Sequence, residues 1–452
     1  MIASIVSRTR WLIRARSTTA AVIQTAAFQV ITIVANLATG IITARLLAPA
    51  GRGELAAINL VPTIMAYLLT LGVPGALLYH LKREADNAPR LIAAALVVTT
   101  GLGVIAVIIG YSVMPYALRE YPPHVVALAR LFLFTTPISL FTLLCTSAFD
   151  SAGDFWYGNG TRFLAPLLTL ASLCAFWGTG RLDVFTAAAS YALPSLPIGA
   201  KMLTDVVRHY RPVFVPIARA VYGQLFSYGL RSFGISLLTA VAQQIDQVLV
   251  VAFLTPAKMG LYAVALAVSR VLQIFQSSVV RVLLPKIAAR PVDEVVASVG
   301  RATRITLVLT TPLCIGVVVL APLLLGLVYG GKFAGATGVL RVLAVEAIFG
   351  GIAWILSQAF LALGKPGIVT VLQGIGVALS FPLMVVLIPR MGLVGAGLSL
   401  LVSTVVRVAF VTMCFPWLLK ARAPGFLLTN GDVDSLRQRF RLNRPSVIEP
   451  KP

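Results

Sequence analysis

The chain has few charged residues, and few of these are acidic. Only 12% of its 452 residues are charged, and Lys and Arg outnumber Asp and Glu by 37 to 15. A soluble domain carries about 25% charged residues, so the composition argues against a soluble fold. The three histidines, His80, His124 and His209, are not spaced as metal ligands. The sequence therefore gives no reason to expect a metal centre.

Motifs of the common enzyme classes are also missing. The sequence has no Gly-rich GK[ST] loop, which would indicate an ATP-driven engine, and no G-x-S-x-G or H-E-x-x-H motif. Four cysteines lie within apolar runs without redox or metal spacing, and we expect them to be small core residues: Cys145, Cys174, Cys314 and Cys414. We expect a protein that is not an enzyme and holds no cofactor.

Apolar residues are abundant instead. They make up 58% of the chain, and the mean hydropathy is +0.93. Because a transmembrane helix needs about 20 apolar residues, a chain of this length can hold about a dozen. The sequence predicts an all-α polytopic membrane protein with spans near 21–46, 55–80, 91–114, 125–149, 159–178, 184–204, two within 222–284, 304–329, 336–363, 367–389 and 392–419.

The basic residues predict the orientation of these spans. The N-terminal segment, the even-numbered connections and the tail hold 25 Lys and Arg residues, whereas the odd-numbered connections hold 7. By the positive-inside rule, both termini are predicted to be cytoplasmic. The net charge of +22 therefore reflects orientation in a membrane, and we expect no nucleic-acid partner.

The sequence contains an internal repeat. LLAPAGRGELAA at 46–57 aligns with FLTPAKMGLYAV at 253–264, and AFDSAG at 148–153 aligns with AFLALG at 359–364. The two offsets are nearly equal and correspond to six spans, which predicts parallel repeats about an axis along the membrane normal. The predicted domains are an N-terminal six-helix lobe at 1–206, a C-terminal six-helix lobe at 207–420 and a basic cytoplasmic tail at 421–452.

Polar side chains recur at steps of three and four in the central spans, which places each set on one helical face. The first set is Ser232, Ser236, Thr239, Gln243 and Asp246; the second is Arg270, Gln273, Ser277 and Arg281. The first span carries a stripe at the repeat offset: Thr25, Gln29, Thr32, Asn36 and Thr39. Charged groups facing lipid are costly, so these faces are predicted to line protein or a water-filled transport pathway.

The motifs A-R-L-L-A-P-A-G-R-G-E-L (44–55) and D-Q-V-L-V-V-A-F-L-T-P-A-K-M-G-L-Y-A-V-A (246–265) resemble the multidrug/oligosaccharidyl-lipid/polysaccharide (MOP) exporter superfamily. The chain is most similar to polysaccharide-biosynthesis flippases, and the resemblance covers about residues 21–419. It implies translocation of undecaprenyl-pyrophosphate-linked oligosaccharides across the bacterial inner membrane by alternating access. The implied partners are this lipid-linked cargo, membrane lipid and polysaccharide polymerase or assembly proteins. An H⁺ or Na⁺ gradient could drive the transport.

Such a cargo predicts which residues would bind it. Arginine pairs with phosphate oxygens and stays charged, so Arg270 is the first candidate for the pyrophosphate and Arg231 the second. Weaker candidates are Arg407, Arg281 and Arg45. The sugar hydroxyl groups would be hydrogen-bonded by Asn36, Gln243 and Gln273.

Two acidic residues lie deep within predicted spans, Asp246 and Glu346. A carboxylate at this depth can serve as a proton or cation site that couples transport to a gradient. Counting from the turn at Pro256, Asp246 and Arg270 lie at similar depth. We predict that they face each other across the cavity, where they could equally form a structural ion pair.

Three alternatives stay open. A cation-coupled drug antiporter of the same fold would need a pocket centred on acids. A lipid II flippase is the second alternative. Relatives in the lipid II branch carry arginines in their first two helices, whereas the second span here has none in its interior. A membrane-embedded polysaccharide polymerase or ligase would need a large outer loop, and no predicted outer connection exceeds about a dozen residues.

Overall fold

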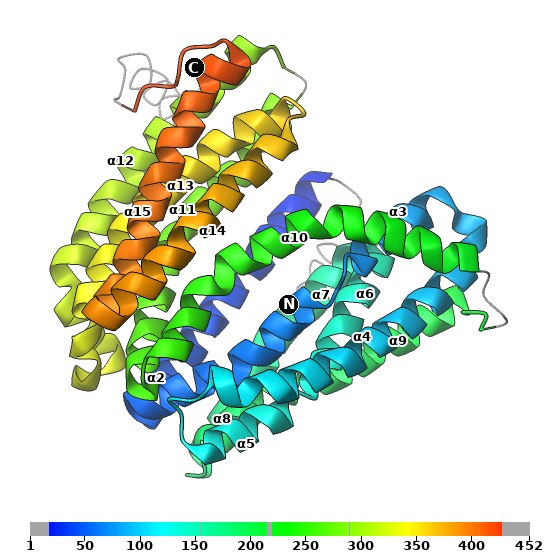
Figure 1. The fold of residues 1–452 in the computed structure, drawn as a ribbon, viewed down its shortest axis with the longest axis horizontal. Helices are drawn as coiled ribbons and strands as arrows, with labels where there is room; N and C mark the ends of the chain where they lie inside the picture. Colours follow the sequence, from blue (N-terminus) through cyan, green and yellow to red (C-terminus); the bar gives the residue numbers. More distant parts are fainter. Residues whose placement is uncertain (1–17, 154, 215–218, 289, 427–452) are drawn as a thin grey trace, which may run out of the picture. The chain divides into compact units, whose positions relative to one another are not determined.

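Helices make up the ordered elements of the protein (Figure 1). The computed structural model describes residues 18–153, 155–214, 219–288 and 290–426, without the side chains of 18–30, 155–159, 162, 232, 235 and 236. These residues contain no β-strand. The predicted all-α class is therefore confirmed.

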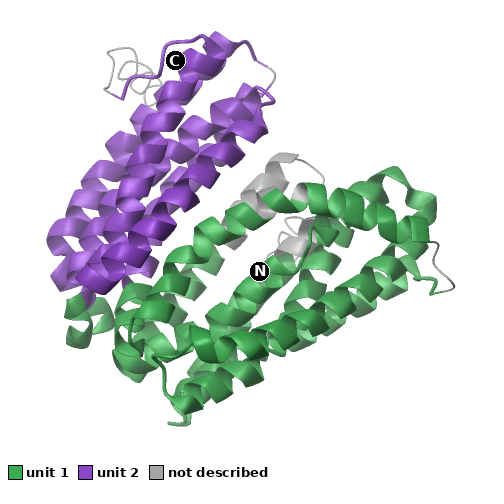
Figure 2. Cartoon of the chain, in the orientation of Figure 1, with its two compact units in different colours: residues 1–264, 326–335 green, residues 265–325, 336–452 purple. Residues whose placement is uncertain are grey.

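The chain forms two compact units (Figure 2). Unit 1 comprises residues 1–264 and 326–335, and unit 2 comprises 265–325 and 336–452. The helices of unit 1 are α2 (Thr18–Leu68), α3 (Val73–Arg83), η1 (Ala85–Asn87), α4 (Ala88–Ala117), α5 (Pro123–Phe132), α6 (Thr135–Ser151), α7 (Phe155–Gly178), α8 (Val184–Ala192), α9 (Ser195–Tyr210), α10 (Arg219–Phe253) and the start of α11 (Pro256–Ile287).

Unit 2 holds the rest of α11 and the later helices. These are α12 (Val292–Leu324), α13 (Thr337–Ala362), α14 (Pro366–Met391) and α15 (Leu393–Cys414). A short π-helix, η4 (Phe415–Leu419), follows α15. The short helices η2 (Leu325–Tyr329) and η3 (Gly331–Ala336) lie between α12 and α13 in sequence and belong, except for their outer ends, to unit 1. Within unit 2, α13 packs against α12 and α15, and α14 packs against α15.

The lengths of these helices suit a bilayer. Among the described residues, eight helical segments are long and apolar enough to span a membrane, and two shorter apolar helices accompany them. Large apolar side chains such as Ile108, Val319 and Val371 are exposed, at 60%, 64% and 62%. In a soluble protein this exposure would be unfavourable, whereas lipid tails solvate it. The predicted spans are helical, although some are divided between two helices, and the polytopic membrane class is confirmed. The number of twelve spans stays a prediction.

The helices of unit 1 are interrupted both between and within the predicted spans. Within α2, Ala48 adopts φ 56° and ψ 179° in the connection predicted between the spans 21–46 and 55–80. The proline at position 49 disfavours a helical ψ in the residue before it, but does not account for the positive φ. Between α2 and α3, Gly72 has φ 73°, and a Cβ there would lie 2.2 Å from the carbonyl oxygen of Gly229. This break therefore requires glycine for its backbone geometry and for the close approach of α10.

The boundary of unit 1 lies later in the chain than the predicted lobe boundary at residue 206. Unit 1 includes α10 because this helix packs on α2, α3 and α4. The arrangement as two six-helix lobes related by a parallel repeat stays a prediction. The predicted tail lies outside the described residues from position 427 onward.

The two repeated Pro-x-x-x-Gly motifs lie against each other within unit 1. A Cβ on Gly53 would lie 1.7 Å from the carbonyl oxygen of Pro256, and a Cβ on Gly260 would lie 1.9 Å from that of Pro49. Both distances are far below van der Waals contact, so each position admits only glycine without a backbone shift. The reciprocal contact joins the beginning of α11 to the second half of α2.

Candidate functional site

Unit 1 holds a buried carboxylate, Asp246, on α10. Its side chain is buried, and the hydroxyl group of Tyr262 on α11 donates a hydrogen bond to Oδ2 at 2.7 Å. Tyr262 is itself fully buried. A carboxylate within the membrane is costly unless polar groups compensate its charge, and the tyrosine hydroxyl does so in part.

Unit 2 holds a second polar cluster, centred on Glu346 of α13. The hydroxyl group of Thr404 on α15 donates a hydrogen bond to Oε1 of Glu346 at 2.8 Å. Gly350, one turn along α13, leaves room for this carboxylate, since a Cβ there would lie 3.3 Å from Oε1. The negative charge of Glu346 acts on the guanidinium of Arg407, which follows Thr404 by one helical turn.

Arg407 extends from α15 toward α14. A Cβ on Gly376 of α14 would lie 3.6 Å from Cδ and 3.8 Å from Nη1 of Arg407, so this glycine leaves the space that the side chain passes. The hydroxyl group of Ser403 donates to the carbonyl oxygen of Gly376 at 2.7 Å and ties the two helices together. Nε of Arg407 is buried, and no residue in the described part of the chain accepts a hydrogen bond from it.

Gln276 of α11 extends the polar region along α13. Its Nε2 donates to the carbonyl oxygen of Ala347 at 2.8 Å, and the residue is buried. A Cβ on Gly351 would lie 2.3 Å from the Gln276 amide, so the glycine provides the space for it. The glycine pair at 350 and 351 thus accommodates polar groups from two neighbouring helices.

The structure brings together only some of the predicted site residues. Glu346 and Arg407 share one cluster, which the sequence did not predict. Asp246 lies in unit 1 and Arg270 in unit 2, so their predicted pairing stays a prediction. Of the other candidates, Gln273 is half-buried, whereas Asn36, Arg231, Gln243 and Arg270 are exposed. The predicted stripes of the first span and of the first central span include four residues whose side chains lie outside the described part of the structure: Thr25, Gln29, Ser232 and Ser236.

Arg45, a weaker candidate for the pyrophosphate, is already engaged. Its Nε donates to the carbonyl oxygen of Val328 at 2.8 Å, and its Nη2 donates to that of Leu327. These carbonyls belong to η2, where a helix leaves acceptors without intrahelical donors. Arg45 therefore caps a helix end within unit 1. Arg281 is exposed.

The connection between α4 and α5 holds a further polar group, Tyr121. Burial raises the pKa of the Tyr121 hydroxyl group, and the charge of Glu54 raises it further. His124 lies 3.8 Å from the Glu54 carboxylate. Oη of Tyr121 is buried and has no hydrogen-bond partner among the described residues.

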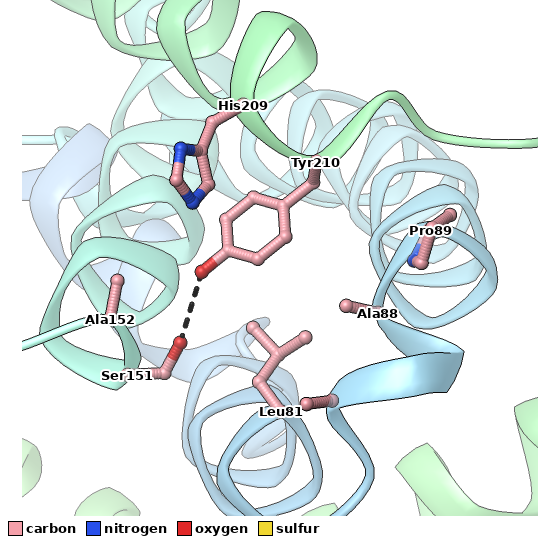
Figure 3. A pocket seen from close by; sticks show the side chains of 8 residues that line it. Leu81, Ala88, Pro89, Ser151, Ala152, His209 and Tyr210 are labelled. Atoms are coloured by element: carbon pink, nitrogen blue, oxygen red, sulfur yellow. Dashed lines mark hydrogen bonds between the residues drawn. The ribbon is translucent and has the colours of Figure 1, made fainter.

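A pocket of about 420 Å³ opens in unit 1, where α3, α4, α6 and α9 meet (Figure 3). The hydroxyl group of Tyr210 points into it, donates to the carbonyl oxygen of Ala148 at 2.9 Å, and lies 3.2 Å from Oγ of Ser151. The pocket is otherwise lined by small apolar side chains and His209, and contains none of the predicted site residues. In the described residues, no group of three His, Cys, Asp or Glu side chains could hold a metal ion.

Comparison with known proteins finds a matching family and relatives in sequence and in fold. A family model described as "Polysaccharide biosynthesis protein" matches residues 42–338. The "Probable low-salt glycan biosynthesis flippase Agl15" of Haloferax volcanii is 26% identical over 196 residues. This match spans 42% of either chain.

Solved structures share the fold over nearly the whole chain. The lipid II flippase MurJ in an inward closed conformation has a TM-score of 0.74 at 14% identity, and covers 93% of this chain and 92% of its own. An inward-facing multidrug resistance MATE family transporter of the MOP superfamily has a TM-score of 0.68 at 17% identity, with 86% and 96% covered. At these identities the likeness concerns the fold alone.

Proposed function

Because the chain belongs to the polysaccharide biosynthesis protein family, we propose that it is a flippase of the MOP exporter superfamily that translocates lipid-linked oligosaccharides. The observation that carries this proposal is the family match over residues 42–338. The curated relative, named as a glycan biosynthesis flippase, supports it. The cargo would be an undecaprenyl-pyrophosphate-linked repeat unit that crosses the bacterial inner membrane, with both termini of the protein in the cytoplasm.

Basic and amide side chains within the predicted spans support an anionic, sugar-bearing cargo. A pyrophosphate carries about two negative charges, which a low-dielectric path must compensate with cations and hydrogen-bond donors. Arg270 and Arg231 are exposed on long helices, and Arg407 retains a buried, unused donor. Asn36 and Gln243 are exposed amides that could bind sugar hydroxyl groups. Alternating access would present these residues to each side of the membrane in turn.

A second candidate is a cation-coupled antiporter of drugs or small molecules. The observation that favours it is the buried carboxylate of Asp246, since a desolvated acid can bind a proton or cation. In a flippase the same residue could couple transport to an H⁺ or Na⁺ gradient, and Glu346 is the other candidate for this role. Lipid II is the alternative lipid-linked cargo.

Reconstitution would separate these functions. The protein is placed in liposomes that contain undecaprenyl-pyrophosphate-linked oligosaccharide or lipid II, and an impermeant lectin or glycosidase reports which leaflet holds the headgroup. We expect faster movement of the oligosaccharide lipid than in protein-free liposomes. If only a cationic drug moves, and only with an imposed ion gradient, the antiporter function holds instead.

A further inference from the structure

The cluster in unit 2 is built from three helices that converge on one arginine. Glu346 lies nine residues after the start of α13 and Arg407 fourteen residues after the start of α15, about 14 Å and 21 Å along these helices. Both charges therefore lie well inside the spanning segments. Gly376 of α14 completes the cluster from the third helix.

An arginine at this depth needs compensation for its charge. Glu346 supplies part of it, and the Thr404 hydroxyl fixes the position of the carboxylate through its hydrogen bond of 2.8 Å to Oε1. The compensation is incomplete, because Nε of Arg407 is buried with no acceptor among the described residues. A buried donor without a partner is costly, and a charged one more so. A ligand that offers a hydrogen-bond acceptor to Arg407 would therefore bind favourably in this cluster.

The chemistry of the missing acceptor follows from that of arginine. The guanidinium is a planar fork of donors that matches phosphate or carboxylate oxygens in a bidentate way. The cargo proposed above brings phosphate oxygens to the membrane interior. A resident carboxylate close by would weaken the binding of such an anion, because like charges repel at low dielectric.

We propose that Glu346, Thr404 and Arg407 form a phosphate-binding site in which Arg407 is the ligand and Glu346 is a resident counter-ion that the phosphate displaces. This inference rests on the proposed function. Thr404 and Gly376 are positioning residues: Thr404 holds the carboxylate, and Gly376 leaves room for the arginine. Glu346 neutralises Arg407 while the site is empty and repels the bound phosphate, which speeds its release.

The test is binding of a defined probe to purified full-length protein in detergent micelles. Undecaprenyl pyrophosphate is titrated while protein fluorescence is followed, with inorganic pyrophosphate and undecaprenol as separate arms. We expect Arg407→Ala to bind undecaprenyl pyrophosphate about tenfold more weakly and Arg407→Lys to retain part of the affinity. Glu346→Gln should bind several-fold more tightly and release the lipid more slowly.

A matched control is Arg341→Ala. Arg341 lies on α13 of the same unit, and its Nε already donates to the carbonyl oxygen of Val318 at 3.0 Å. We expect its affinity to stay within about twofold of the unaltered protein. Thr404→Val should not reproduce the Glu346→Gln effect, because it frees the carboxylate without removing its charge. Each variant is first checked for an unchanged elution volume and melting temperature, and Arg407→Lys keeps the test decisive if Arg407→Ala does not fold.

The outcomes separate this site from the proposed function. If the unaltered protein binds undecaprenyl pyrophosphate and folded Arg407→Ala binds it equally well, the site is wrong and the function stands. Weaker binding by Glu346→Gln would refute the displacement of the counter-ion. If the unaltered protein does not bind undecaprenyl pyrophosphate at all, the proposed function fails. Equal affinity for inorganic pyrophosphate would support a phosphate site that does not depend on the lipid.

Discussion

At the scale of single residues, two buried tyrosines of unit 1 illustrate how the environment of a hydroxyl group decides its contribution. Tyr262 donates a hydrogen bond of 2.7 Å to Asp246. Tyr121 has a buried hydroxyl group with no partner among the described residues. The same substitution, Tyr to Phe, should therefore have different consequences for stability at the two positions.

Tyr262→Phe should destabilise the protein. It removes the hydrogen bond that Tyr262 donates to the buried Asp246 carboxylate, and a hydrogen bond to a charged group contributes about 1.5–3 kcal/mol. The melting temperature of the purified protein in detergent should fall. Tyr67→Phe is the control, since Tyr67 is 43% exposed. An unchanged melting temperature for Tyr262→Phe would mean that the carboxylate does not depend on this hydroxyl group.

Tyr121→Phe should be neutral or slightly stabilising near pH 7, because it removes a buried polar group that lacks a partner. The raised pKa of Tyr121 adds a pH dependence. The folded pKa lies above the unfolded value of about 10, so this contribution to stability is complete below pH 10 and is lost as the pH rises above it. Melting curves from pH 7 to 11 should show a steeper alkaline loss for the unaltered protein than for Tyr121→Phe.

At the scale of helices, the apolar runs predicted the all-α membrane class and the position of most helices, because a bilayer demands about 20 apolar residues per crossing whatever the details of packing. The breaks inside spans were not predicted. The break at Gly72 depends on the approach of Gly229 from α10, which is distant in sequence. The hydrogen bond from Thr404 to Glu346 was missed for a similar reason, since it depends on how α15 is rotated against α13.

The contact between the repeated motifs gives a prediction at this scale. Gly53→Ala would place a methyl group 1.7 Å from the carbonyl oxygen of Pro256, and Gly260→Ala would place one 1.9 Å from that of Pro49. The backbones must separate, and overpacking of this kind costs about 1–3 kcal/mol or more. Each variant should melt at a lower temperature and show less transport.

The matched control for these variants is Gly101→Ala in α4, where a Cβ would meet no atom within 4 Å. Alanine favours a helix over glycine by about 1 kcal/mol, so this variant should melt at the same temperature or higher. Equal melting temperatures for Gly53→Ala and Gly101→Ala would contradict the close contact at Pro256.

At the scale of the whole molecule, the family resemblance could be predicted from the sequence alone, because the motifs at 44–55 and 246–265 are continuous in sequence. The family match confirms that the chain is a polysaccharide biosynthesis protein, and the solved structures share its fold. The candidate site was only partly predictable. Arg407 and Glu346 were selected as intramembrane charges, whereas their common cluster required the packing of α13, α14 and α15.

The orientation in the membrane stays a prediction, and labelling of single cysteines tests it. Because 25 basic residues fall on one set of connections and 7 on the other, Ala257 in the first turn of α11 should be outside, and Asn87 in the connection before α4 should be in the cytoplasm. Each position is changed to Cys in a chain whose four cysteines are replaced by alanine. Ala257→Cys should react with an impermeant maleimide in intact cells, whereas Asn87→Cys should react only after permeabilisation. The two sites are separated by an odd number of predicted spans and should therefore lie on opposite sides of the membrane. The reverse pattern of labelling would invert the whole topology. Equal reactivity in intact cells would mean that the predicted number of spans between them is wrong.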